Sequence, residues 1–292
     1  MANVAFIGLG TMGLVMARNI IEGGHQVSGY DTEADAVANH VANGGSAASS
    51  PANAADGAEI IITMLPVGEV VKRVLFDASG VVEAAGVGSL VIDMSTINPV
   101  ETDEIRDGLA AKGVRMIDAP VGRTSEQAKT GNLLIMAGGN AADIDEARPV
   151  FECMGDTVVD CGGPGMGGRM KIINNLMSTV LNVLTAEVLT LAESSGLDRD
   201  LAIEVMCGTA AGLGHMSTTY PAKVLKNDIS PAFMIDLAKK DLGIAITLSE
   251  TLGVPLALAG MAEAVYAKAH DEGRGAQDWT ALYEMLRQKY VS

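Results

Sequence analysis

A single lysine stands among amides and a hydroxyl in an otherwise apolar stretch of the chain. Lys171, Asn174, Asn175, Ser178 and Asn182 follow one another at i, i+3, i+4, i+7 and i+11, so they share one face of a helix. Burial lowers the pKa of a lysine, which then can donate a proton to a carbonyl oxygen near neutrality. The pattern favours a general acid within a buried polar row. A solvent-facing stripe and a row of interhelical hydrogen bonds are the alternatives.

A second group of polar side chains follows a predicted strand, in the segment Asp118-Ala-Pro-Val-Gly122-Arg123-Thr124-Ser125. The carboxyl ends of parallel strands are where α/β folds bind ligands. A guanidinium with two hydroxyls offers the donors that a carboxylate, phosphate or sulfonate needs. The segment therefore predicts an anion site. A structural arginine that caps a helix or pairs with an acid is the alternative.

The N-terminus carries a glycine motif between a strand and a helix. Gly8-Leu9-Gly10-Thr11-Met12-Gly13 matches G-x-G-x-x-G, and Asp31 ends the next predicted strand, near the offset expected of a ribose-binding acid. Glycines let the backbone approach a pyrophosphate, and the helix N-terminus supplies N–H groups and a partial positive charge. The motif predicts a dinucleotide site.

The carboxylate of Asp31 also indicates which dinucleotide is bound. It can accept hydrogen bonds from a ribose 2′-hydroxyl but would repel a 2′-phosphate, and no arginine follows it in Thr32-Glu33-Ala34. NAD is therefore expected, with NADH preferred over NADPH. If Asp31 is only a helix cap, the choice stays open.

These groups must be positioned by two kinds of structure. Apolar strands alternate with helical stretches up to about residue 160, which predicts βαβ units and a mostly parallel sheet. After the glycine cluster at 162–168, a long helix over 169–194 and four further helical segments follow. The fold expected is an α/β Rossmann-type N-terminal domain, residues 1–163, plus an all-α C-terminal domain, residues 164–292, for substrate binding and oligomerisation, with a cleft between them. The strands are predicted at 3–8, 26–31, 59–65, 89–95, 115–120 and 133–137.

The charge of the chain excludes some partners. Twenty Lys and Arg against 36 Asp and Glu give a formal charge of −16. Nucleic acids and anionic membranes require basic patches, so neither is an expected partner. Three cysteines without metal spacing indicate free thiols in a reducing cytoplasm, and no metal site is expected.

Taken in order along the whole chain, these motifs resemble the β-hydroxyacid dehydrogenases, the 3-hydroxyisobutyrate dehydrogenase-like family. The matching segments are Gly8 to Gly13, Ser95-Thr-Ile, Asp118-Ala-Pro-Val, Gly165 through Asn175, and Phe233 through Lys240-Asp241-Leu. The resemblance implies an NAD-dependent oxidoreductase that acts on a CH–OH group, assembled as a homodimer or homotetramer.

The resemblance also implies roles for single residues. Lys171 exchanges the proton at the substrate oxygen, and Asn175 positions the substrate. Phe233 lies near the nicotinamide and Lys240 near the cofactor. Further residues bordering the cofactor are expected to be Met64, Leu65, Pro66 and Thr96.

One departure from the family pattern bears on the substrate. Common members read D-A-P-V-S-G-G, whereas this chain has Gly122-Arg123-Thr124. The segments P-V-G-R-T-S, G-T-A-A-G-x-G-H and S-P-A-F-M-I-D-L-A resemble a branch that reduces a sulfonated aldehyde, 3-sulfolactaldehyde, with NADH. The expected sulfonate-binding residues are Gly122, Arg123, Thr124, Ser125, Asn174 and Ser178.

Two alternatives to that function are open. One is an NAD-dependent dehydrogenase of a carboxylated semialdehyde, such as 3-hydroxyisobutyrate, tartronate semialdehyde or 4-hydroxybutyrate dehydrogenase. The other is a catalytically silent dinucleotide-binding module, against which Lys171 and Asn175 argue.

Overall fold

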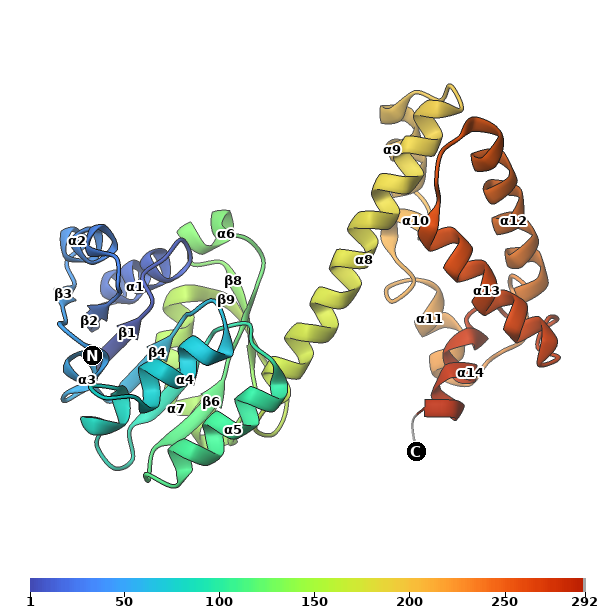
Figure 1. The fold of residues 1–292 in the computed structure, drawn as a ribbon. Coiled ribbons are helices and arrows are strands. Elements are labelled where there is room, and N and C mark those ends of the chain that lie inside the picture. Colours follow the sequence, from blue (N-terminus) through green and yellow to red (C-terminus); the bar gives the residue numbers. More distant parts are fainter. Residues whose placement is uncertain (291–292) are drawn as a thin grey trace. The chain divides into compact units, whose positions relative to one another are not determined.

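The structure, a computed structural model, describes residues 1–290 and divides into two compact units, Met1–Leu176 and Met177–Ser292. Figure 1 traces the chain through both. Helix α8 (Met166–Ser194) begins in the first unit and continues into the second. The predicted domain boundary at 163/164 lies just after the last strand, which ends at Asp160. It therefore precedes the division between the two units at 176/177 by the first residues of α8.

A parallel six-stranded sheet with the order β3-β2-β1-β4-β5-β6 organises the first unit. This is the strand order of a dinucleotide-binding sheet, in which the topology reverses between β1 and β4. The strands are β1 (Asn3–Ile7), β2 (Gln26–Tyr30), β3 (Ser46–Ala47), β4 (Ile60–Thr63), β5 (Leu90–Asp93) and β6 (Arg115–Asp118).

Helices pack on both faces of this sheet because its strands are apolar on both faces. Successive side chains of β1 alternate: Val4 and Phe6 join one buried cluster, and Ala5 and Ile7 join another. The helices of this unit, some of them visible on the two faces in Figure 1, are α1 (Gly13–Glu22), α2 (Ala34–Ala42), α3 (Pro51–Ala55), α4 (Gly68–Phe76), α5 (Pro99–Ala110), α6 (Ser125–Lys129) and α7 (Ala141–Met154).

A second, smaller sheet lies next along the chain. Strand β7 (Val121–Gly122) is antiparallel to β8 (Leu133–Ala137), and β8 is parallel to β9 (Gly155–Asp160). The sequence predicted the strand at 133–137 correctly. It did not show that this strand belongs to a separate sheet. The sixth strand of the parallel sheet is instead the two-residue β3, at the edge beside β2.

In the described residues of the second unit, every regular element is a helix. After α8 come α9 (Arg199–Cys207), α10 (Ala210–Leu213), α11 (Thr219–Ala222), α12 (Ile235–Leu252), α13 (Ala257–Asp271) and α14 (Ala281–Tyr290). Its buried cluster is small and centres on Ile235, Ala269, Ala281 and Met285. The predicted fold class, a Rossmann-type domain followed by a helical one, is confirmed.

Candidate functional site

The glycine loop after β1 is shaped by close backbone contacts. Gly8 has a φ of +99°, and a Cβ there would overlap the carbonyl oxygen of Met64. A Cβ on Gly13 would overlap the carbonyl oxygen of Gly8. The fold itself therefore requires these two glycines, since they bring the end of β1, the end of β4 and the start of α1 together.

Gly10 differs from its neighbours because a Cβ there would meet no protein atom within 4 Å. The fold does not need a glycine at this exposed position, so the open space above it suits the close approach of a ligand. Helix α1 begins three residues later, with no side-chain cap and no acid in its first turn. The backbone N–H groups and the helix dipole at this end are suited to a pyrophosphate.

Asp31, at the carboxyl end of β2, fixes this loop from the other side. Its Oδ2 accepts a hydrogen bond from Leu9 N at 2.6 Å, and its Oδ1 accepts one from Glu33 N at 2.9 Å. The N-cap position of α2 is occupied by Glu33, so Asp31 is not its cap. Oδ1 also lies 3.5 Å from the Thr32 hydroxyl, so Oδ2 is the oxygen with a lone pair left to accept a ribose hydroxyl.

The loops after β4 and β5 are joined by a buried polar network that the sequence analysis missed. Asp93 accepts from the Thr63 hydroxyl at 2.9 Å and from Ser95 N at 3.1 Å, and Ser95 Oγ accepts from Leu65 N at 2.9 Å. Burial raises the pKa of Asp93. Polar residues at the ends of two apolar strands were the available signal. The network holds the Met64-Leu65-Pro66 turn beside Thr96, which is exposed.

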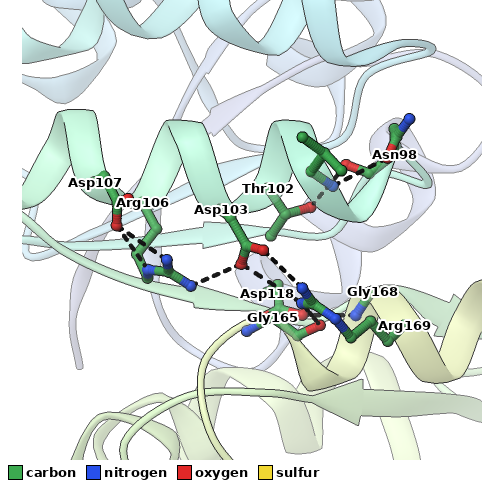
Figure 2. A network of polar contacts seen from close by, with 10 residues as sticks. Asn98, Thr102, Asp103, Arg106, Asp107, Asp118, Gly165, Gly168 and Arg169 are labelled. Carbon is green, nitrogen blue, oxygen red and sulfur yellow. Dashed lines mark hydrogen bonds and ion pairs between the residues drawn. The ribbon is translucent and has the colours of Figure 1, made fainter.

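The start of α8 carries Lys171 and is attached to the sheet by Asp118. Figure 2 shows the Asp118 carboxylate at Gly165 and Gly168, whose N–H groups donate to it at 2.7 and 2.6 Å. Lys171 Nζ donates to the carbonyl oxygen of Val121 at 2.7 Å. Burial lowers the pKa of Lys171, a direction that is compatible with the predicted role as a general acid.

Arg123 follows Val121 by two residues but does not turn its guanidinium to Lys171. It has a φ of +73°, an uncommon backbone conformation for a residue with a side chain. Its Nη1 donates to Asp156 Oδ1 at 2.7 Å and to the carbonyl oxygen of Asn132 at 2.6 Å. This is the ion pair that the sequence left open as an alternative for Arg123.

The other residues of the first unit that were predicted to bind the anion have different surroundings. Thr124 caps α6 in a capping box with Gln127, which accounts for its hydroxyl, and Ser125 begins that helix. Gly122 is buried in β7. Asn174 is exposed, and its side chain lies 3.4 Å from that of Asn175.

Ser178, Phe233 and Lys240 belong to the second unit and are placed within it. Ser178 is exposed on α8. Lys240 is exposed on α12 and pairs with Asp241 at 3.0 Å. Phe233 meets Trp279 edge to face, and buried Asp278 accepts from Phe233 N at 3.2 Å. Asp278, which the sequence analysis did not single out, thus fixes the backbone at Phe233.

Comparisons with known proteins identify the family of the chain. The family described as the NAD binding domain of 6-phosphogluconate dehydrogenase matches residues 3–163. The family described as the NAD-binding of NADP-dependent 3-hydroxyisobutyrate dehydrogenase matches residues 165–286. Together the two families span almost the whole chain.

Individual relatives match over nearly their full lengths. The chain is 51% identical to the 3-sulfolactaldehyde reductase of Escherichia coli, covering 98% of this chain and 96% of that one. It is 33% identical to the 3-hydroxyisobutyrate dehydrogenase of Pseudomonas aeruginosa, covering 99% and 100%. A solved structure of Mycobacterium tuberculosis 3-hydroxyisobutyrate dehydrogenase with L-serine superposes with a TM-score of 0.70 at 34% identity, covering 98% and 99%. The chain therefore belongs to the 3-hydroxyisobutyrate dehydrogenase family of nicotinamide-dependent oxidoreductases.

Proposed function

We propose that the enzyme reduces 3-sulfolactaldehyde to 2,3-dihydroxypropane-1-sulfonate with NADH. The observation that carries the proposal is the 2.7 Å hydrogen bond from Lys171 to the Val121 carbonyl. It places an ammonium against the same short segment that supplies Arg123. The 51% identity to a 3-sulfolactaldehyde reductase supports the choice of substrate.

Lys171 acts on the reacting oxygen. A bound NADH supplies the hydride that the aldehyde carbon receives. The ammonium has three N–H donors, of which the Val121 carbonyl takes one, so another can polarise the aldehyde oxygen and then transfer its proton to the developing alkoxide. The amide of Asn175 hydrogen-bonds the reacting or the adjacent oxygen. Lys171 then regains a proton from water, and the product alcohol leaves.

The sulfonate end of the substrate is held by donors. Arg123 contributes the charge, and the resemblance adds Thr124, Asn174 and Ser178. In the chain alone, however, the Arg123 guanidinium pairs with Asp156, whose pKa that pairing lowers, so Asp156 stays ionised in any neutral assay. A substrate anion therefore either displaces Asp156 from the Arg123 guanidinium or is repelled by the negative charge of Asp156.

Replacing Asp156 by asparagine is expected to lower KM for 3-sulfolactaldehyde by about twofold to fivefold at unchanged kcat, since partly exposed ion pairs are weak. Steady-state NADH oxidation measures both constants. Asp145→Asn, which removes the same charge from the exposed side of α7, is the matched control and leaves KM unchanged. A raised KM in Asp156→Asn would mean that Asp156 holds Arg123 in its binding orientation, and the competition would be refuted.

The cofactor preference rests on Asp31. Its Oδ2 orders the glycine loop through Leu9 N and retains a lone pair for a ribose hydroxyl, whereas a 2′-phosphate would bring negative charge against the carboxylate. We therefore assign NADH over NADPH, although one matching family description names an NADP-dependent enzyme.

A carboxylated semialdehyde is the second candidate substrate, favoured by the 3-hydroxyisobutyrate dehydrogenase relatives at 33% identity. NADH oxidation with 3-sulfolactaldehyde beside tartronate semialdehyde separates the two. Sulfonate specificity predicts a kcat/KM at least about tenfold higher for the sulfonated aldehyde, and a preference for tartronate semialdehyde would overturn it.

We also propose a cytoplasmic homodimer or homotetramer. Helix α8 is long and apolar enough to cross a membrane by length and composition. It also carries the polar row from Lys171, and a charged side chain within a membrane-spanning helix is costly. Its exposed apolar side chains, and the small buried cluster of the second unit, suit cover by another copy of the chain. The exposed α8 side chains include Leu176, Val180, Leu181 and Val183.

A further inference from the structure

The beginning of α8 is held by the buried carboxylate of Asp118, which lies in a distant part of the sequence. Asp118, the last residue of β6, is 4% exposed. Its Oδ1 accepts from Gly165 N at 2.7 Å and its Oδ2 accepts from Gly168 N at 2.6 Å. Both oxygens are therefore engaged by N–H groups at the start of the helix, which otherwise lack intrahelical partners.

The backbone around this carboxylate is equally fixed. Asp118 N donates to Gly138 O at 3.0 Å, and Gly138 N donates to Asp118 O at 2.8 Å. A Cβ on Gly167 would overlap the carbonyl oxygens of Met136 and Asp118, so the first turn of α8 packs directly on the strand ends. The carboxylate thus connects two rigid pieces of backbone.

A second contact reaches the same turn from α5. Arg169 Nη2 donates to Asp103 Oδ2 at 2.6 Å, and Asp103 Oδ1 accepts a hydrogen bond from Arg106 Nη1 at 2.8 Å (Figure 2). These side chains are about one-third exposed, so their ion pairs contribute less than a buried charge-assisted bond.

These contacts close a ring that includes the lysine. Lys171 lies three residues after Gly168, less than one helical turn away, and Val121 lies three residues after Asp118. Lys171 Nζ bonds Val121 O, and Gly168 N bonds the Asp118 carboxylate. A shift of the helix start relative to Asp118 must therefore move the ammonium relative to Val121.

We propose that Asp118 is a positioning residue for Lys171: its carboxylate sets the start of α8 and, through it, the place of the proton-donating ammonium. The inference rests on the proposed role of Lys171. Asp118 touches neither substrate nor cofactor in this account and acts only through the helix.

Protonation of Asp118 is expected to weaken this hold. The charged or titratable groups that act on it are Asp93, Arg169 and Cys161. Burial raises the pKa of Asp118 to about 6, and the negative charge of Asp93 adds to the rise. Below that pH the carboxyl gains an O–H, and one oxygen can no longer accept as strongly from a backbone N–H. The kcat for reduction is therefore expected to fall as pH decreases through about 6.

The test replaces Asp118 by asparagine in the full-length enzyme. The amide leaves one acceptor and turns an NH₂ group against a backbone N–H. We expect kcat to fall by about tenfold to a hundredfold, as for a displaced catalytic group. The Kd for NADH, from fluorescence, should stay within about twofold, and the acid limb of kcat near pH 6 should disappear. Asp103→Asn, the matched change in the α5 carboxylate that pairs with Arg169, should change kcat by less than about threefold.

Asp118→Glu covers the case in which the asparagine variant does not fold. It keeps the charge but lengthens the side chain by one methylene, so kcat should fall while the acid limb remains. A purely structural role predicts a lower Tm in these variants with wild-type kcat per NADH-binding site and an unchanged acid limb, and that result would overturn the inference. If Lys171→Ala itself kept wild-type turnover, the proposed acid would fail instead, whatever Asp118 did.

Discussion

Replacing Lys171 by alanine is expected to lower kcat for aldehyde reduction by about 100-fold or more, the usual effect of losing a general acid. The Lys171 ammonium lies 2.7 Å from the carbonyl oxygen of Val121, in the segment proposed to bind the anion. The Kd for NADH should not change, because Lys171 lies outside the glycine loop. Steady-state kinetics and NADH fluorescence measure the two quantities.

The pH profile separates proton transfer from mere binding by Lys171. Because burial lowers its pKa from 10.5, and reduction needs the protonated amine, kcat/KM for reduction should fall as pH rises through the lowered pKa. Alcohol oxidation needs the neutral amine and should rise over the same interval. Lys171→Arg keeps the charge but cannot release its proton, so it should also be slow. An arginine variant with wild-type turnover would refute proton donation.

Replacing Asp31 by asparagine is expected to shift the ratio of kcat/KM for NADH over NADPH by about 100-fold toward NADPH. The charge-assisted hydrogen bond to the ribose is lost, which costs NADH about tenfold or more, and the repulsion of the 2′-phosphate disappears. The amide keeps one oxygen, which can serve only one of Leu9 N and Glu33 N, so the ratio of the two cofactors is measured because a loss of loop order affects both alike.

Glu33→Gln is the matched control for that experiment. It removes one negative charge two residues away, from an exposed side chain, and should change the ratio by less than about threefold. Equal shifts in both variants would show a general charge effect, and an unchanged ratio in Asp31→Asn would contradict the assigned cofactor preference.

The sequence predicted the Rossmann order of elements because its signals are local. Gly8 and Gly13 are required by backbone contacts, and Asp31 ends a strand that pairs with β1. The two-residue β3 has too few residues for any pattern. The sheet to which the strand at 133–137 belongs could not be predicted, because hydrophobic spacing does not encode which strands pair.

The positioning groups could not be read from spacing for the same reason. Asp118 and Gly165 are 47 residues apart, and Arg123 and Asp156 are 33 apart, so only the folded chain joins them. The hydroxyl of Thr124 was predicted for the substrate, yet locally it caps α6. A short polar segment can either cap a helix or bind a substrate, and its sequence alone does not distinguish the two roles.

We propose that two cations act on the two ends of one substrate, Lys171 on the aldehyde and Arg123 on the sulfonate. Comparing 3-sulfolactaldehyde with glyceraldehyde, which has a hydroxyl in place of the sulfonate, in wild type and Arg123→Ala tests this directly. We expect Arg123→Ala to lower kcat/KM for 3-sulfolactaldehyde by about tenfold or more, through KM, and to leave kcat/KM for glyceraldehyde unchanged. An undiminished preference for the sulfonated aldehyde in Arg123→Ala would contradict it.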